Sequence, residues 1–177
     1  MSMIIIASLI AIILVGLFLL SQYNTLAAML SAIEHNKEQI NIQLDKRFNT
    51  FQSLIIAVRE FMDYERSTLK EVTLLRARAE AALAMGDEKT RIAAENEISK
   101  IAFHLPTIFA QYPELKAGKN VLQLQEEIAN NETRLAYAKQ AYNESISHFL
   151  LKKSSLIEGL IVKFFPNKLD KTYITWN

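Results

Sequence analysis

Several kinds of residue are absent or scarce in this chain of 177 residues. It has no cysteine, which excludes a disulfide framework, a thiolate metal site and a cysteine nucleophile. Neither sign of charge dominates, because 20 lysines and arginines face 19 acidic residues. The strongly basic face of a nucleic-acid-binding protein is therefore not expected, and we predict no nucleic-acid partner. Glycine and proline are both absent from residues 17–85, so the sequence predicts long helices and an all-α fold.

The N-terminal segment 3–20 is apolar and carries no charge. A helix needs about 20 apolar residues to cross a bilayer, so this segment is long enough to do so. A cleaved signal peptide is the alternative, but no basic residue precedes the segment and no small-residue cleavage site ends it. We therefore predict a transmembrane anchor over residues 1–22, with the lipid bilayer as its partner. The anchor residues are predicted to include Met3, Ile4, Leu9, Ile13, Phe18, Leu20 and Tyr23.

The basic residues that flank the anchor bear on its orientation. No lysine or arginine precedes it, and only Lys37 lies within about 20 residues after it. Basic residues favour the cytoplasmic side, so this one lysine favours a cytoplasmic location for the bulk of the chain. A periplasmic location stays an alternative.

Beyond the anchor, apolar residues recur at helical spacing. The pattern predicts helix over residues 21–84, without deciding whether that helix is continuous, and further helices over 88–109 and 120–152. Two charged residues, Arg47 and Glu65, interrupt the first apolar seam on one helical face. We predict that they pair with charges on a neighbouring helix, such as Glu132 or Arg134, and fix the register of the helices. A recognition site for a partner is the alternative.

The C-terminal segment 154–177 is basic and amphipathic. Residues 152–177 hold five lysines and two acidic residues, a net charge of +3. Its apolar residues fall on one helix face, which either packs on the bundle as a short fourth helix or lies in a membrane interface. The candidate lipid-contacting residues are Leu156, Ile157, Leu160, Ile161, Lys163, Phe164, Phe165 and Trp176.

Motifs that would carry catalysis are not apparent. The three histidines are separate, and Glu144 with His148 is one surface pair rather than a metal site. No glycine-rich phosphate loop or nucleophile elbow occurs. The sequence therefore predicts no catalytic residues, no metal and no cofactor.

Several stretches together resemble the LemA family. They are residues 42–47 (IQLDKR), 112–117 (YPELKA), 122–127 (LQLQEE) and 131–143 (NETRLAYAKQAYN). Residues 49–53 (NTFQS) depart from the family pattern, which has a proline there. The resemblance implies a single-span protein of the bacterial inner membrane with an antiparallel helical bundle over residues 23–153. Three long helices and a short C-terminal helix are then expected, and the family has no established catalytic residues.

Three hypotheses for the function follow. We favour a non-enzymatic, membrane-anchored scaffold that self-associates as a homo-oligomer and organises or remodels the bacterial membrane. Family relatives include a magnetosome-membrane protein and a gene product encoded beside a metalloprotease. The alternative is an adaptor that regulates a membrane protein partner, such as a metalloprotease or a transporter. An enzyme is the third hypothesis, and it would need Arg47, Glu65 and Glu132 to meet in one pocket.

Overall fold

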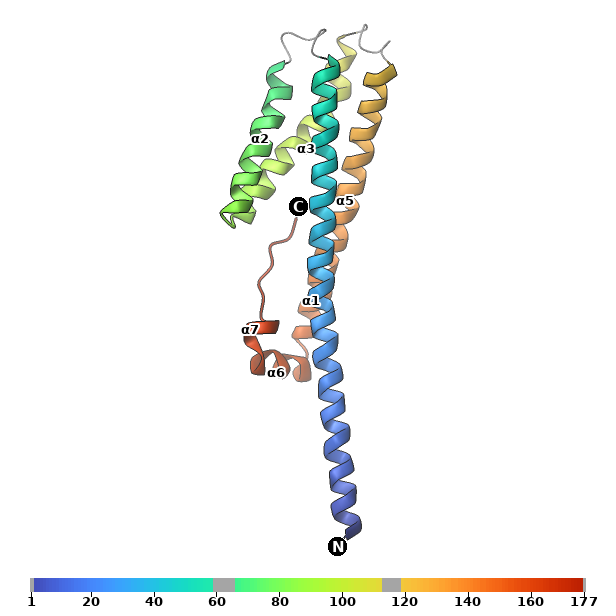
Figure 1. The fold of residues 1–177 in the computed structure, drawn as a ribbon, viewed down its shortest axis with the longest axis vertical. Helices are drawn as coiled ribbons and strands as arrows, with labels where there is room; N and C mark the ends of the chain where they lie inside the picture. The colour runs from blue at the N-terminus through green and yellow to red at the C-terminus, as the bar shows by residue number, and fades with distance from the viewer. Residues whose placement is uncertain (1, 59–65, 113–118, 177) are drawn as a thin grey trace. The chain divides into compact units, whose positions relative to one another are not determined.

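The computed structural model describes residues 2–58, 66–112 and 119–176, and helices dominate this part of the chain (Figure 1). No strand occurs within these three ranges, and the predicted all-α class is confirmed. The helices are α1 (Ser2–Val58), α2 (Arg66–Ala84), α3 (Glu88–Ala110), α5 (Lys119–Lys153), α6 (Leu156–Phe164) and α7 (Pro166–Leu169).

The predicted helices at 88–109 and 120–152 agree with α3 and α5 to within one residue at each end. The predicted stretch 21–84 is instead divided between α1, which ends at Val58, and α2, which begins at Arg66. Within the described ranges, four long helices are therefore found where three were expected. Helix α1 also includes the apolar N-terminal segment, because no glycine or proline separates that segment from the seam that follows.

The junction between α2 and α3 has the local chemistry that the sequence predicts. Gly86 has a φ of 72°, a left-handed conformation that a glycine after a helix end adopts without strain. Asp87 then caps α3, and its carboxylate accepts a hydrogen bond of 3.1 Å from the backbone N–H of Thr90. The hydroxyl of Thr90 also donates to this carboxylate at 2.6 Å, and the two hydrogen bonds, that of the hydroxyl above all, lower the pKa of Asp87.

Two compact units make up the chain, and each combines segments that are distant in sequence. Unit 1 comprises residues 1–36 and 141–175, and unit 2 comprises residues 37–140 and 176–177. A linear division at residues 22 and 153 does not describe this arrangement, since α1 and α5 each contribute to both units.

Unit 2 is an antiparallel bundle of α2, α3 and the adjoining parts of α1 and α5 (Figure 1). Its core is a cluster of buried side chains from all four helices, since each helix turns one apolar stripe inward. Partly buried neighbours such as Leu75 and Leu124 pack against this cluster. The buried members are Phe51, Leu54, Val58, Val72, Ile98, Ala102, Leu105, Phe109, Val121 and Ile128.

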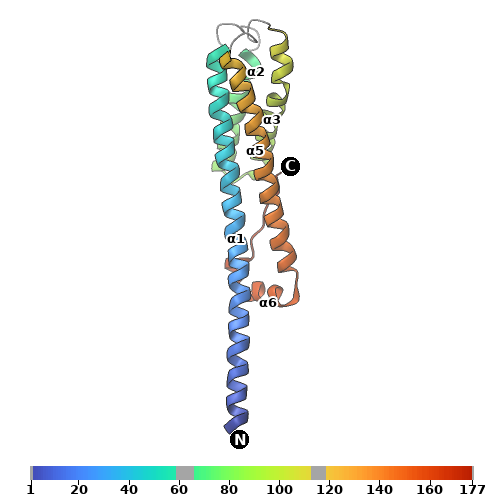
Figure 2. The ribbon, with the colours of Figure 1, turned by 90° about the vertical axis from the view of Figure 1, so that its right-hand side faces the viewer.

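Unit 1 contains the N-terminal part of α1, the end of α5, and the short helices α6 and α7. Leu30 and Ile33 of α1 and Ile146 of α5 are buried in this unit, and at its boundary with unit 2 the side-chain amide of Asn36 donates to the carbonyl of Ala141 at 3.3 Å. Helix α6 lies beside α1 in two perpendicular views (Figures 1 and 2). The apolar N-terminal segment of α1 extends past these contacts and is exposed from Met3 to Val15.

Candidate functional site

A buried ion network lies inside unit 2, with Arg47 of α1 at its centre. Arg47 is only 1% exposed. Its guanidinium donates hydrogen bonds to Glu132 of α5 at 2.9 Å and to Ser99 of α3 at 2.8 Å. It also forms an ion pair with Glu95 of α3, a residue that is likewise 1% exposed. Arg47 thus links three helices of the bundle.

Arg76 brings α2 into the same network. Its guanidinium reaches Glu95 at 3.4 Å, Asp45 at 2.6 Å and Glu80 at 2.8 Å. Each of the four helices of unit 2 therefore supplies at least one charged side chain to a chain of paired residues. A charge in the interior is tolerated when it is paired and hydrogen-bonded in this way.

A small polar cavity of about 350 Å³ lies next to the network, lined in part by Asn41, Arg76, Arg91 and Glu95. The buried arginines and glutamates of the network pair with one another. The carboxylates of Glu95 and Glu132 are held by arginine, and Arg47 directs its donors to these partners and to Ser99. This arrangement suits the fixing of helix register, because any shift would separate buried charges.

The predicted polar residues have different outcomes. Arg47 and Glu132 form an ion pair, whereas Arg134 is exposed and belongs to none of the ion pairs found among residues 2–58, 66–112 and 119–176. Glu65 lies outside the described residues. Sequence reasoning missed Glu95 and Arg76. A signal for Glu95 was present, since it lies three residues from both Ile92 and Ile98 and so interrupts the seam of α3.

Close to this network, Trp176 is 2% exposed and has two cations near its ring. The guanidinium of Arg91 lies 5.4 Å from the centre of its ring, and the ammonium of Lys139 lies 5.3 Å from it. Burial and the neighbouring charge of Arg47 lower the pKa of Lys139. The prediction that Trp176 contacts lipid is therefore wrong, since its ring is enclosed by cation–π contacts within the bundle.

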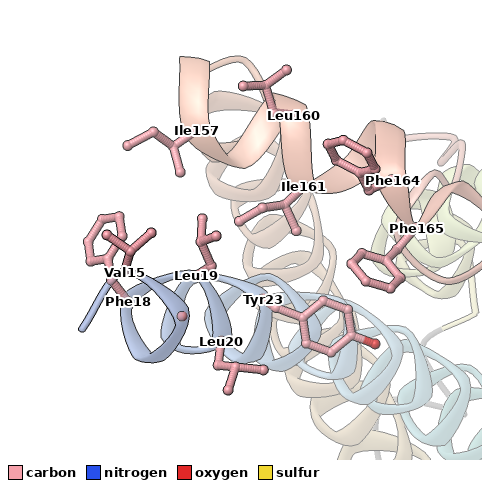
Figure 3. Close-up of a pocket in the computed structure, with 11 residues that line it drawn as sticks. Val15, Phe18, Leu19, Leu20, Tyr23, Ile157, Leu160, Ile161, Phe164 and Phe165 are labelled. Carbon is pink, nitrogen blue, oxygen red and sulfur yellow. The ribbon is translucent and has the colours of Figure 1, made fainter. Parts of the chain in front are cut away.

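Unit 1 has a different kind of site, an apolar groove of about 840 Å³ between α1 and α6 (Figure 3). On the α1 side it is lined by residues of the apolar segment and by Tyr23. On the other side it is lined by α6 and the residue after it. The ring of Tyr23 meets that of Phe165 edge to face, with 5.2 Å between the ring centres. The lining residues are Val15, Gly16, Phe18, Leu19, Leu20, Tyr23, Ile157, Leu160, Ile161, Phe164 and Phe165.

Polar contacts hold the start of α6 against the end of α5. Glu158 forms an ion pair with Lys152 and accepts a hydrogen bond from the hydroxyl of Ser155. The bonds from Lys152 and Ser155 lower the pKa of Glu158 to about 2. Lys153 also donates to Asp170 at 2.5 Å. Lys171 also forms an ion pair with Glu34 at 3.6 Å, so three of the five lysines of the C-terminal region are paired within unit 1.

The face of α6 that is turned away from these contacts is apolar and exposed. Leu156 is 89% exposed and Phe164 is 79% exposed, with Leu160 between them. Ile161 and Val162 are buried on the inner side of the helix. Lys163 is exposed, and none of the ion pairs in the described part of the chain includes it. Of the two alternatives for this segment, packing as a short helix applies to the inner side, which faces the other helices of unit 1, and the outer side is exposed.

The predicted anchor is uncovered as well. One helix in the described residues is long and apolar enough to cross a membrane, with a mean hydropathy of 3.2 over 18 residues. None of this window is buried. Met3, Ile4, Leu9, Ile13, Phe18 and Leu20 are exposed, and Tyr23 is half-buried against Phe165.

Within residues 2–58, 66–112 and 119–176, no group of three histidine, aspartate or glutamate side chains is placed to hold a metal ion.

Comparison with known proteins identifies the family. None of the curated proteins compared with the chain matches it. The model of the LemA family matches residues 36–175, which include nearly all of unit 2 and the C-terminal part of unit 1. With most of its length matched, the chain belongs to the LemA family.

Proposed function

We propose that this protein is a single-span, membrane-anchored helical scaffold of the bacterial inner membrane. The observation that carries the proposal is the apolar segment of α1, in which no residue of the 18-residue window is buried. Such a segment is unfavourable in water, because large contiguous apolar surface drives burial. A bilayer removes that surface from water, and the helix satisfies its own backbone hydrogen bonds there.

A second membrane contact supports the same proposal. Helix α6 lies at the level of Val15 to Tyr23, where the apolar segment ends. Its outer side presents Leu156, Leu160 and Phe164, with Lys163 at the edge. A helix of this kind lies in the interface plane, with its apolar side among acyl chains and its lysine near anionic headgroups.

We place the bundle on the cytoplasmic side, on the basis of the flanking lysine count. A chain without native cysteine makes the test direct. Single cysteines at Thr133 and Ser147, both exposed on α5, would be labelled in intact cells with a maleimide that cannot cross the inner membrane. Labelling that requires opening of the inner membrane supports the cytoplasmic side, and labelling without it places the bundle in the periplasm.

Self-association is the further part of this proposal. Ala7 and Ala11 lie one turn apart on the uncovered segment, which is the small-residue spacing that lets transmembrane helices approach closely. Oxidative cross-linking of Ala11→Cys in membranes is expected to give covalent dimers in higher yield than Ile13→Cys. Absence of dimers for both variants would contradict self-association. Adducts with another membrane protein would instead favour the adaptor hypothesis.

The anchor itself is tested by fractionation. Leu9→Arg combined with Ile13→Arg places two charges near the centre of the segment, at about 2.5–3.5 kcal/mol each for insertion. We expect this variant to leave the alkaline-washed membrane pellet, in which the wild type remains. The matched control is Leu74→Arg with Phe103→Arg, at two exposed bundle positions that are 71% and 75% exposed. If both variants leave the membrane pellet, or if both remain in it, the proposal that this segment anchors the protein is contradicted.

A further inference from the structure

The groove between α1 and α6 has the size and the lining of a ligand site. Its volume of about 840 Å³ falls within the range of about 300–1,000 Å³ that is usual for small-molecule pockets. Its lining is apolar except for the hydroxyl of Tyr23. No charged side chain lines it, so a polar ligand would find no partner within it (Figure 3).

The position of the groove along α1 indicates the occupant. Val15, Gly16 and residues 18–20 form one wall, and they belong to the segment that the proposed function places in the hydrocarbon. Tyr23 follows at the level where aromatic residues meet the headgroups. A groove at this level opens toward acyl chains rather than toward bulk water. The exposed apolar side of α6 continues the same surface outward.

We propose that this groove binds an acyl chain of a membrane phospholipid, held between α6 and the end of the span. The proposal rests on the membrane anchoring proposed above. Bound lipid would fill space that the side chains of α1 and α6 leave open, and would add dispersion contacts along both walls. The scaffold would then carry a lipid as part of unit 1, in addition to the lipids that surround its span.

Gly16 offers a way to close the groove without disturbing the fold. It lies on the groove wall, and a Cβ added there would meet no atom within 4 Å. The Cβ of Gly16→Phe therefore meets no obstacle and its ring is directed into the space of the groove wall, while the variant stays apolar for membrane insertion and removes a glycine from a helix interior. Leu17→Phe is the matched control, because Leu17 is exposed on the same turn and does not line the groove.

The test is native mass spectrometry of the full chain, extracted in mild detergent and titrated with dioleoyl phosphatidylglycerol. We expect the wild type and Leu17→Phe to bind one lipid in a saturable manner, and Gly16→Phe to bind it about tenfold more weakly. Equal binding by all three proteins, or no saturable binding by the wild type, would overturn the proposal. A wild-type groove occupied by a second copy would show as a lipid-free dimer that Gly16→Phe abolishes, which also overturns it.

The same samples separate this proposal from the anchor. If wild type and Gly16→Phe both remain in the alkaline-washed membrane pellet, the anchor holds and the titration judges the groove alone. If the wild type is not retained in membranes, the scaffold proposal fails first, and the groove proposal fails with it.

Discussion

The two units differ most in the charges that unit 2 buries and in the continuous apolar segment that unit 1 exposes. Unit 2 buries charges, since Arg47 and Glu95 are each 1% exposed in its interior. Unit 1 exposes apolar side chains, from Met3 at 84% to Leu156 at 89%. In a protein surrounded only by water, both features would be costly. Paired charges in unit 2 suit the fixing of helix register, whereas the exposed apolar side chains of unit 1 are what the proposed membrane contact would cover.

The largest expected effect comes from breaking the network of unit 2. Arg47→Met would leave the carboxylates of Glu95 and Glu132 buried without their shared partner. Removing one member of a buried ion pair costs about 3–5 kcal/mol of unfolding free energy. Chemical denaturation followed by circular dichroism measures this loss. Arg134→Met is the control, and its exposed position predicts a change within about 0.5 kcal/mol.

A second variant tests whether the stability of unit 2 needs these charges or only needs each buried charge to be paired. Arg47→Met combined with Glu95→Leu and Glu132→Leu replaces the linked charges by apolar groups of similar volume. Such replacements are often neutral or stabilising, so we expect the triple variant to regain most of the loss. A triple variant that is no more stable than Arg47→Met alone would contradict this account of the network.

A smaller effect is expected at the start of α6, and it depends on pH. The pKa of Glu158 is lowered to about 2 by its bonds from Lys152 and Ser155, from an ordinary value of 4.5. A carboxyl with a lowered folded-state pKa stabilises the fold fully above its ordinary pKa, and the stabilisation is lost as the pH falls toward the folded value. The wild type should therefore be more stable than Glu158→Gln at pH 6. The difference should shrink between pH 4.5 and about pH 2. Denaturation of both proteins across this range measures it, and a difference that does not change with pH would contradict the pairing.

Sequence patterns predict those features that local chemistry determines. The boundaries of α3 and α5 follow from apolar spacing and from Gly86 and Asp87, and Arg47 was recognisable as a charge within an apolar seam. What the sequence did not predict depends on packing between distant segments. Glu95 meets both Arg47 and Arg76 only once the helices that carry them align. The groove exists only because residues 157–165 fold back beside residues 15–23.

Trp176 illustrates this limit most clearly. An aromatic residue in a basic tail has the composition of an interfacial anchor, and composition alone assigned it to lipid. Its surroundings include Arg91 of α3 and Lys139 of α5, whose cations lie near its ring. No local pattern around residue 176 contains that information.

The smallest expected effect is on the fluorescence of Trp176, which we expect brominated lipid to leave nearly unchanged. The experiment tests whether Trp176 is buried while the exposed side of α6 contacts lipid. Trp176 is the single tryptophan of the chain, so its fluorescence reports its surroundings alone. In vesicles whose phospholipids carry bromine on the acyl chains, we expect its emission to be nearly unquenched, since the ring lies among Arg91, Lys139 and the bundle. The control is Trp176→Phe with Phe164→Trp, which moves the indole to the exposed side of α6 and should be strongly quenched. Quenching of the wild type to the same extent would mean that Trp176 lies among acyl chains, because bromine quenches only at close contact. That result would contradict the burial of Trp176 and its separation from the lipid-facing side of α6.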